Sequence, residues 1–167
     1  MITIDGLNRN YLYTIDPGLS GTGYAEWHPS GELRRAGVFQ EKLEDANRWW
    51  VRGGLMAGRL IRLLLPMRHS NAVIEFPMYM ESVAGLAASK GSTLKLAFLI
   101  GCYAEAFRRR GCVVQLVTPL DWKGQLPKDV VIRRIHRVIS EEDCNAYGIR
   151  SHAYDAVGLG LWVRGKL

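Results

Sequence analysis

The chain has 167 residues, 48% of them hydrophobic and 23% charged, which is the balance of an ordinary folded domain. Lys and Arg number 22 against 16 Asp and Glu, giving a formal net charge of +6 that favours a polyanion over an acidic protein as partner. No run approaches the roughly 20 apolar residues of a membrane helix, and the first residues do not resemble a secretory signal. The three cysteines lack the spacing of a disulfide framework or a zinc site. We therefore expect one domain over residues 1–167, without a membrane partner, in the cytoplasm.

The first part of the chain is predicted to form a three-stranded antiparallel meander. Runs rich in β-branched and aromatic residues cover Tyr11–Asp16, Tyr24–Trp27 and Leu33–Phe39. Clusters of Pro, Gly and Ser separate these runs and supply the turns between them.

Helices and strands alternate in the rest of the chain. Apolar residues at helical intervals predict helices, and short β-branched runs predict buried strands. The expected elements are a helix over 42–65, a strand over 71–76, a helix from a Ser92 or Thr93 cap to Arg110, a strand over 112–117, a helix over 127–140, and a helix over 151–163 capped by Ser151. The order β-β-β-α-β-α-β-α-α is that of the ribonuclease H-like fold. This is an α/β fold whose mixed five-stranded sheet has three antiparallel strands followed by parallel βαβ units, flanked by helices.

Four residues in these elements are candidates for metal-dependent catalysis. Asp16 ends the first strand and Glu75 lies in the fourth, where an ionised carboxylate is costly unless it is paired or bound to metal. His152 and Asp155 are three residues apart, which places both on one face at the start of the last helix. A carboxylate in a strand is more often a satisfied polar residue or an exposed edge position, and the alternative role for Asp155 is to complement the helix dipole.

The combination of these four side chains indicates a particular chemistry. Three carboxylates and an imidazole suit Mg²⁺ or Mn²⁺ better than a tetrahedral zinc site. Two such ions about 3.5 to 4 Å apart orient an attacking water and stabilise the leaving oxygen in phosphodiester hydrolysis. The sequence therefore predicts a two-ion site for phosphodiester hydrolysis, with metal-binding and catalytic roles for Asp16, Glu75, His152 and Asp155.

From about Tyr11 to Trp162 the motifs resemble those of the RuvC-type Holliday junction resolvases of bacteria and their phages. The most specific segment, Ile-Asp-Pro-Gly-Leu-Ser-Gly-Thr-Gly-Tyr at 15–24, looks like the family's opening strand and turn, in which the Asp carries a metal. Residues 72–75 resemble the strand of the second acid, and residues 92–96 resemble the start of the long helix that contributes to dimerisation there. Residues 152–156 resemble the closing motif, whose first position is Asp in some members and His in others. The chain departs from the family in a longer loop after Glu75 and in two glycines of the last helix.

The resemblance also implies contacts with DNA. Residues 118–130 look like the family's basic stretch, so Lys123 and Lys128 are expected to contact or position phosphates. An aromatic residue shortly after the second acid wedges at the junction centre in the family. We favour Tyr79 for this role over Phe76, which we expect to face the core. An ordinary half-buried loop aromatic is an equal interpretation of Tyr79.

Two arginine clusters are candidates for a phosphate track, because each neutralised phosphate releases counterions and strengthens binding. Arg133, Arg134 and Arg137 lie in the helix after the motif lysines, whereas Arg108–Arg110 ends an earlier helix. A solvated helix face is the alternative for both. We favour phosphate contacts only for the cluster after the lysines.

The residues and the resemblance together imply a homodimeric, Mg²⁺- or Mn²⁺-dependent endonuclease that resolves four-way DNA junctions by paired symmetric incisions. A two-fold dimer places one active site at each of two equivalent strands. The expected location is a bacterial cytoplasm or that of a phage-infected host. A nuclease of the same fold acting on other branched or flap DNA is a second interpretation, and a catalytically silent junction-binding protein is a third. A sugar-kinase-like phosphate fold is excluded because the chain is too short for its two domains.

Overall fold

The computed structural model describes residues 10–40, 48–77 and 86–167, apart from the side chains of residues 86–90. The strands are β1 (Leu12–Asp16), β2 (Thr22–Trp27), β3 (Leu33–Phe39), β4 (Asn71–Glu75) and β5 (Val113–Val117). The helices are α1 (Trp49–Leu64), α2 (Leu86–Arg109), α3 (Pro119–Trp122), α4 (Lys128–His136), α5 (Glu141–Ala146) and α6 (His152–Val163).

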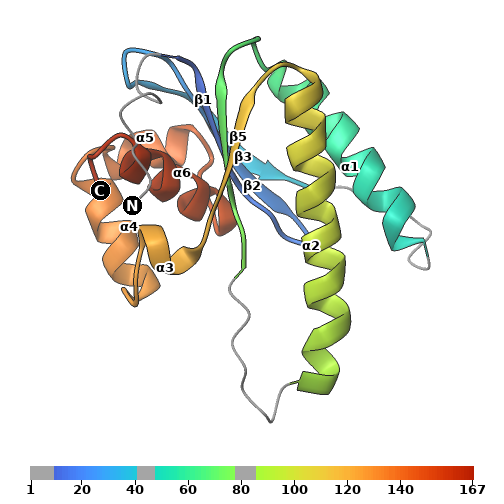
Figure 1. Ribbon diagram of the computed structural model, residues 1–167. Helices are drawn as coiled ribbons and strands as arrows, with labels where there is room; N and C mark the ends of the chain where they lie inside the picture. Colours follow the sequence, from blue (N-terminus) through green and yellow to red (C-terminus); the bar gives the residue numbers. More distant parts are fainter. Residues whose placement is uncertain (1–9, 41–47, 78–85) are drawn as a thin grey trace.

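The strands form one five-stranded sheet in the order β3-β2-β1-β4-β5. β1 and β2, and β2 and β3, pair antiparallel, whereas β4 pairs parallel with both β1 and β5. Helices α1 and α2 cover one face of this sheet, and α3 to α6 lie on the other side (Figure 1). The predicted fold class is therefore confirmed.

Each central strand contributes to two apolar cores because successive side chains point to opposite faces of the sheet. Tyr13 and Ile15 of β1 pack with α1 and α2, while Leu12 of the same strand packs with α6. In β4, Ile74 belongs to the first core and Val73 to the second. This alternation assigns the polar residue that ends each strand to the α6 face.

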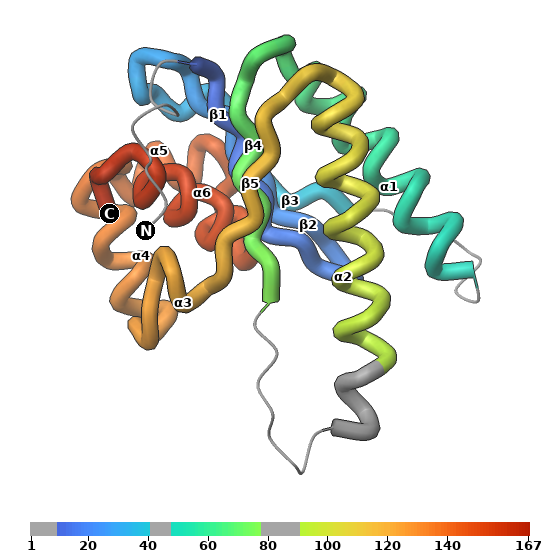
Figure 2. The backbone as a smooth tube through the Cα atoms, viewed as in Figure 1, coloured from blue at the N-terminus to red at the C-terminus, as the bar shows by residue number. Residues whose placement is uncertain are grey.

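Helix α6 is buried on almost all sides, because apolar or small residues surround its whole circumference. Figure 2 shows it beside β1 and β2, although these elements lie at opposite ends of the sequence. Two of its glycines permit this close packing. A Cβ at Gly160 would collide with the Trp27 indole, and one at Gly158 would lie 2.9 Å from a ring carbon of Trp122. These glycines therefore fit the helix to its neighbours rather than loosening it.

Several predicted element boundaries are wrong, each for a local reason. Helix α2 begins at Leu86, so Ser92 and Thr93 lie inside it and neither is its N-cap. The Leu-Ala-Ala-Ser-Lys run before Gly91 is itself helix-favouring. The segment expected as one helix over 127–140 ends after His136, and Ser140 caps a separate α5 by accepting from the Asp143 N–H.

Two further differences concern α1 and α6. Ser151 occupies the cap position of α6 but makes no capping hydrogen bond through its side chain, because its backbone adopts a positive φ of 42°. The first predicted helix is found from Trp49 onward; residues 42–47 lie outside the described residues. Among the helices that are described, none is long and apolar enough to cross a membrane.

Candidate active site

The carboxyl ends of β1 and β4 bring two acids together. The parallel register pairs Ile15 with Ile74, so Asp16 and Glu75 leave the sheet as neighbours. Both point to the α6 face, in step with the alternation along each strand. Their side chains are largely buried, with 10% of Asp16 and 13% of Glu75 exposed.

Helix α6 brings the other two candidates to the same place. Its first turn carries His152, whose Nδ1 lies 2.6 Å from Asp16 Oδ2, within hydrogen-bonding distance. Asp155, one turn later, lies on the same face, as the three-residue spacing predicted. The backbone of β2 allows this approach, since a Cβ at Gly23 would collide with the His152 carbonyl.

A second set of bonds holds α6 against β1 beneath these side chains. The Thr14 hydroxyl donates to the Ala156 carbonyl at 2.7 Å, and the Trp27 indole donates to the Thr14 oxygen at 3.1 Å. All three residues are buried, where such bonds are costly to break. The residue that follows Asp155 is thus tied directly to the strand that carries Asp16.

Two lysines supply positive charge to the acids. Lys123 Nζ lies 3.6 Å from Glu75 Oε2 and 3.2 Å from Asp155 Oδ1, so its ammonium bridges the two carboxylates. Lys128, the first residue of α4, reaches the other Asp155 oxygen at 3.1 Å. Both lysines expected near phosphates therefore lie at the acidic cluster, by which we mean Asp16, Glu75, His152 and Asp155.

The acids do not titrate like exposed carboxyls. Burial and the nearby Glu75 carboxylate raise the pKa of Asp16 to about 7, while the hydrogen bond with His152 opposes the shift. Burial also raises the pKa of Glu75, against the opposing effects of Lys123 and of the Trp122 indole N–H. Both shifts have the sign expected where negative charge is incompletely neutralised, as at functional sites.

The chemistry of this donor set fits a hard divalent cation. Carboxylate oxygens and an imidazole nitrogen are ligands of Mg²⁺ and Mn²⁺, and a cation would relieve the repulsion that raises the Asp16 pKa. Within residues 10–40, 48–77 and 86–167, no three His, Cys, Asp or Glu side chains stand close enough together to hold a metal ion. The Lys123 ammonium lies between Glu75 and Asp155 instead. Binding of a cation by Glu75 and Asp155 therefore requires the Lys123 ammonium to move away.

Besides the two lysines, the residues considered for DNA binding are the aromatic residues after β4 and the arginines of α4. Tyr79 is outside the described residues. Phe76, which was expected to face the core, is 37% exposed, because it follows the last residue of β4 and Pro77 directs the chain away. The reason for preferring Tyr79 over Phe76 is therefore wrong. Arg133, Arg134 and Arg137 are exposed on and just after α4, where Arg133 forms an ion pair with Asp129 at 2.8 Å.

Trp122 is a site residue that sequence reasoning missed. Its indole Nε1 donates to Glu75 Oε2 at 2.6 Å, although 47 residues separate the two in the chain. The available signal was its position immediately before Lys123, in a segment already associated with phosphate contacts. A tryptophan in a short helix gives no indication from sequence alone of which carboxylate its N–H will meet.

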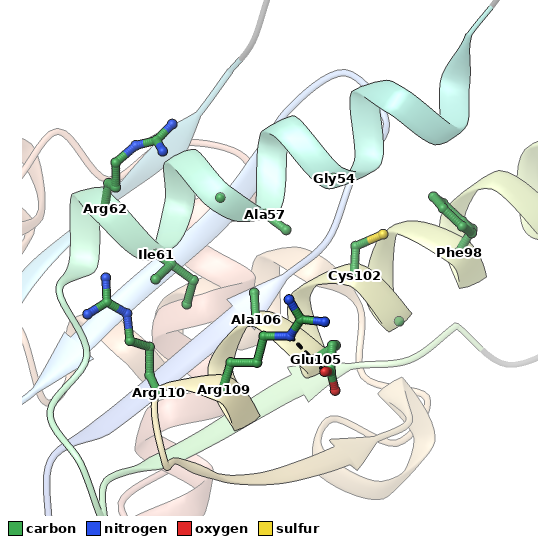
Figure 3. A pocket seen from close by; sticks show the side chains of 12 residues that line it. Gly54, Ala57, Ile61, Arg62, Phe98, Cys102, Glu105, Ala106, Arg109 and Arg110 are labelled. Atoms are coloured by element: carbon green, nitrogen blue, oxygen red, sulfur yellow. Dashed lines mark hydrogen bonds and ion pairs between the residues drawn. The ribbon is translucent and has the colours of Figure 1, made fainter.

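A groove of about 800 Å³ lies between α1 and α2, and none of the four candidate catalytic residues lines it. Gly54, Ala57 and Ala106 are among the residues that line it, and Arg109, also in the lining, forms an ion pair with Glu105 (Figure 3). The groove and the acidic cluster thus belong to opposite faces of the sheet.

Comparison with solved structures decides the architecture. The sequence matches no protein-family profile and no curated protein. The fold, however, matches Thermus thermophilus RuvC in complex with a Holliday junction substrate, with a TM-score of 0.68 and 16% identity over 92% of each chain. The chain has the RuvC fold.

Two further solved structures agree with this match. A second structure of Thermus thermophilus RuvC gives a TM-score of 0.60 at 16% identity, over 91% of this chain and 92% of that one. The yeast mitochondrial Holliday junction resolvase Ydc2 gives 0.55 at 14% identity, over 93% of this chain and 80% of that one. The RuvC fold thus extends over nearly the whole chain, despite the low identity.

Proposed function

We propose that this protein is a divalent-cation-dependent endonuclease that resolves four-way DNA junctions by paired symmetric incisions. The observation that carries the proposal is the cluster of Asp16, Glu75, His152 and Asp155, with Lys123 and Lys128 beside it, at the carboxyl ends of β1 and β4. The similarity to a RuvC bound to a Holliday junction supports this choice of substrate.

The proposed site would hold Mg²⁺ or Mn²⁺, with two ions per active site, on Asp16, Glu75, Asp155 and His152. When bound, the cations supply Lewis-acid polarisation of the scissile phosphate and stabilisation of the leaving oxygen. Burial of Asp16 and Glu75 would strengthen the attraction between these carboxylates and a bound cation, because charges interact more strongly away from bulk water.

His152 has one ring nitrogen directed at Asp16. With the Asp16 carboxylate accepting, the ring proton lies on Nδ1 and leaves Nε2 as the basic atom. His152 then either binds a cation through Nε2 or accepts a proton from the attacking water. In both roles Asp16 fixes the orientation of the imidazole.

The two lysines would neutralise the acids in the DNA-free protein and contact phosphate once DNA is bound. Without DNA, Lys123 and Lys128 neutralise Glu75 and Asp155. With Glu75 and Asp155 holding a cation, the ammonium groups of Lys123 and Lys128 would be free to contact the phosphate that is being cut. Lys128 has more than half of its side chain exposed and is therefore the better placed of the two to reach DNA.

The proposed DNA surface extends from this cluster along α4. Arg133, Arg134 and Arg137 are exposed there and would contact phosphates beyond the cut. An aromatic residue after β4, Phe76 or Tyr79, would stack at the junction centre, and the exposure of Phe76 supports its candidacy.

A homodimer is the assembly that suits this substrate, because a two-fold junction offers two equivalent strands. Trp50, Leu55 and Phe98 leave apolar surface exposed on α1 and α2, on the face opposite to the acidic cluster. Residues 1–167 would act as one nuclease domain per subunit, in a bacterial or phage-infected cytoplasm.

The test is incubation of the purified protein with a labelled synthetic four-way junction, a fork, a flap and a linear duplex, in Mg²⁺, in Mn²⁺ and in chelator. The proposal expects symmetric, cation-dependent nicks in the junction and a dimer by light scattering. Equal cutting of forks and flaps would favour the broader debranching nuclease. Tight junction binding without cleavage under any condition would favour the silent binding protein.

A further inference from the structure

The buried indole of Trp122 contacts Glu75, Gly158 of α6 and Lys123. The side chain ends α3 and is 4% exposed. Its Nε1 donates to Glu75 Oε2 at 2.6 Å, a short bond of the kind that a charged acceptor produces. The ring carbons rest against Gly158 of α6, where an added Cβ would lie 2.9 Å away. The indole therefore spans the space between β4 and α6.

The turn that carries Trp122 is itself rigid. Thr118, directly after β5, forms a capping box with Asp121: its side chain accepts from the Asp121 N–H, and the Asp121 carboxylate accepts from the Thr118 N–H at 2.8 Å. Pro119 fixes the first helical position. The chain thus presents Trp122 from a short helix that is closed at its beginning.

The same ring also holds the lysine that bridges the acids. Lys123 Nζ lies 4.7 Å from the centroid of the Trp122 ring, within the range of a cation–π contact. That ammonium is the group found between Glu75 and Asp155. Trp122 therefore contacts Glu75 directly, and it also stabilises the position of the Lys123 ammonium, which neutralises Glu75.

We propose that Trp122 is a positioning residue, which holds the Glu75 carboxylate in the rotation needed to bind a divalent cation. A glutamate has three side-chain torsions, so a carboxylate at the end of a strand points in many directions unless a donor fixes it. The indole N–H fixes one oxygen, and the packing against Gly158 prevents the ring from moving. This inference rests on the proposed function of the site.

The first test compares Trp122→Phe with wild type. Phenylalanine keeps an aromatic ring at this position but removes the N–H donor, together with the outer ring carbons that lie against Gly158. Loss of a hydrogen-bond partner to a ligating group lowers metal affinity by about 10- to 100-fold in other proteins. We expect calorimetric titration of the DNA-free protein with Mn²⁺ to give an affinity lower by about tenfold or more. The junction-cleavage rate should recover largely at saturating Mn²⁺.

Trp27→Phe is the matched control. Trp27 is also a buried tryptophan, but its Nε1 donates to the Thr14 hydroxyl and not to a site carboxylate. We expect its Mn²⁺ affinity to stay within about twofold of wild type. An unchanged affinity in folded Trp122→Phe, or an equal loss in Trp27→Phe, overturns the inference.

A second measurement needs no altered protein for its readout. In ¹⁵N-tryptophan-labelled wild type, the Trp122 indole N–H resonance should shift on titration with Mg²⁺, with the midpoint found for cleavage. The Trp27 resonance should not shift. A Trp122 resonance that is insensitive to Mg²⁺ while the junction is being cut contradicts the positioning role.

A double-mutant cycle separates this inference from the proposed function. Unfolding is measured in chelator for wild type, Trp122→Phe, Glu75→Ala and the double variant. If the indole acts on Glu75, Trp122→Phe lowers the folding equilibrium constant of the protein that has Glu75. In the Glu75→Ala background the same substitution should lower that constant by a several-fold smaller factor. Equal factors in both backgrounds mean that Trp122 is only a packing residue. If the wild-type protein neither binds cations nor cuts junctions, the proposed function fails, and the role of Trp122 in cation binding fails with it. The double-mutant cycle still measures the coupling between Trp122 and Glu75 in that case.

Discussion

His152 Nδ1 lies 2.6 Å from Asp16 Oδ2, and 136 positions of the chain separate the two residues. This contact joins the first strand to the last helix at the point where the acids gather. Its chemical importance follows from the burial of Asp16, since a carboxylate in that setting needs a donor to remain ionised.

Asp16→Asn should reduce junction cleavage below detection and leave junction binding within a few-fold of wild type. The amide removes a ligand charge from the proposed cation site, whereas the basic surface on α4 is unchanged. Gel-shift and cleavage assays on the same preparation test this. Loss of binding together with an unfolded circular-dichroism spectrum would refute the assignment.

The pH dependence of stability should also change in Asp16→Asn. The pKa of Asp16 is raised from 3.8 to about 7 on folding, so the unfolded chain releases this proton at lower pH than the folded protein. The contribution of Asp16 to stability therefore falls as pH rises from about 4 to about 7, and the loss persists above that range. In chelator, Asp16→Asn should match wild type near pH 4 and exceed it by on the order of 2 kcal/mol at pH 8. A difference in unfolding free energy that does not vary with pH contradicts this expectation.

His152→Asp should retain part of the cleavage activity, because a carboxylate supplies an oxygen ligand at the position of the imidazole. His152→Ala supplies neither a ligand nor a base and should lose about 100-fold or more in rate. Cleavage rates of both variants at saturating Mn²⁺ decide this. If folded His152→Asp is as inactive as His152→Ala, the two side chains are not equivalent here.

Gly160→Ala should destabilise the protein by about 1 to 3 kcal/mol, since its Cβ would collide with the Trp27 indole and displace α6. Gly58→Ala is the matched control: this helical glycine has nothing within 4 Å of an added Cβ and should gain about 0.5 to 1 kcal/mol. Denaturant unfolding measures both. Effects of the same sign would show that helix propensity, and not the fit of α6, dominates at Gly160.

Neutralising Arg134 and Arg137 together should weaken junction binding and lower the slope of log affinity against log salt by up to about 0.9 per lost phosphate contact. Arg108→Gln with Arg110→Gln, at the end of α2, should leave that slope unchanged. Fluorescence-anisotropy titrations at several salt concentrations make the comparison. An equal change in both pairs would mean that general charge, rather than the α4 surface, governs binding.

The sheet and the acids were predictable from sequence because they depend on local patterns. Short runs of β-branched and aromatic residues bounded by turn residues identified the strands, and the strand ends located Asp16 and Glu75. The spacing of His152 and Asp155 predicted one helical face. These inferences need no knowledge of which distant residues meet.

What the sequence did not reveal depends on contacts between distant elements. Trp122 reaches Glu75 only because α3 follows β5, the strand beside β4. The fit of Gly160 against Trp27 likewise exists only after α6 docks on β2. Phe76 was misassigned to the core because, at the last residues of a strand, period-two alternation no longer determines exposure.

The separation of Asp16 from His152 and Asp155 also governs when the protein can become active during synthesis. A ribosome releases the chain from its beginning, so the strand carrying Asp16 emerges long before α6. Until α6 has emerged and docked, the nascent chain carries the basic residues of the proposed DNA surface but lacks half of the proposed catalytic set. A prematurely terminated product that ends before residue 152 would therefore lack the proposed cleavage activity.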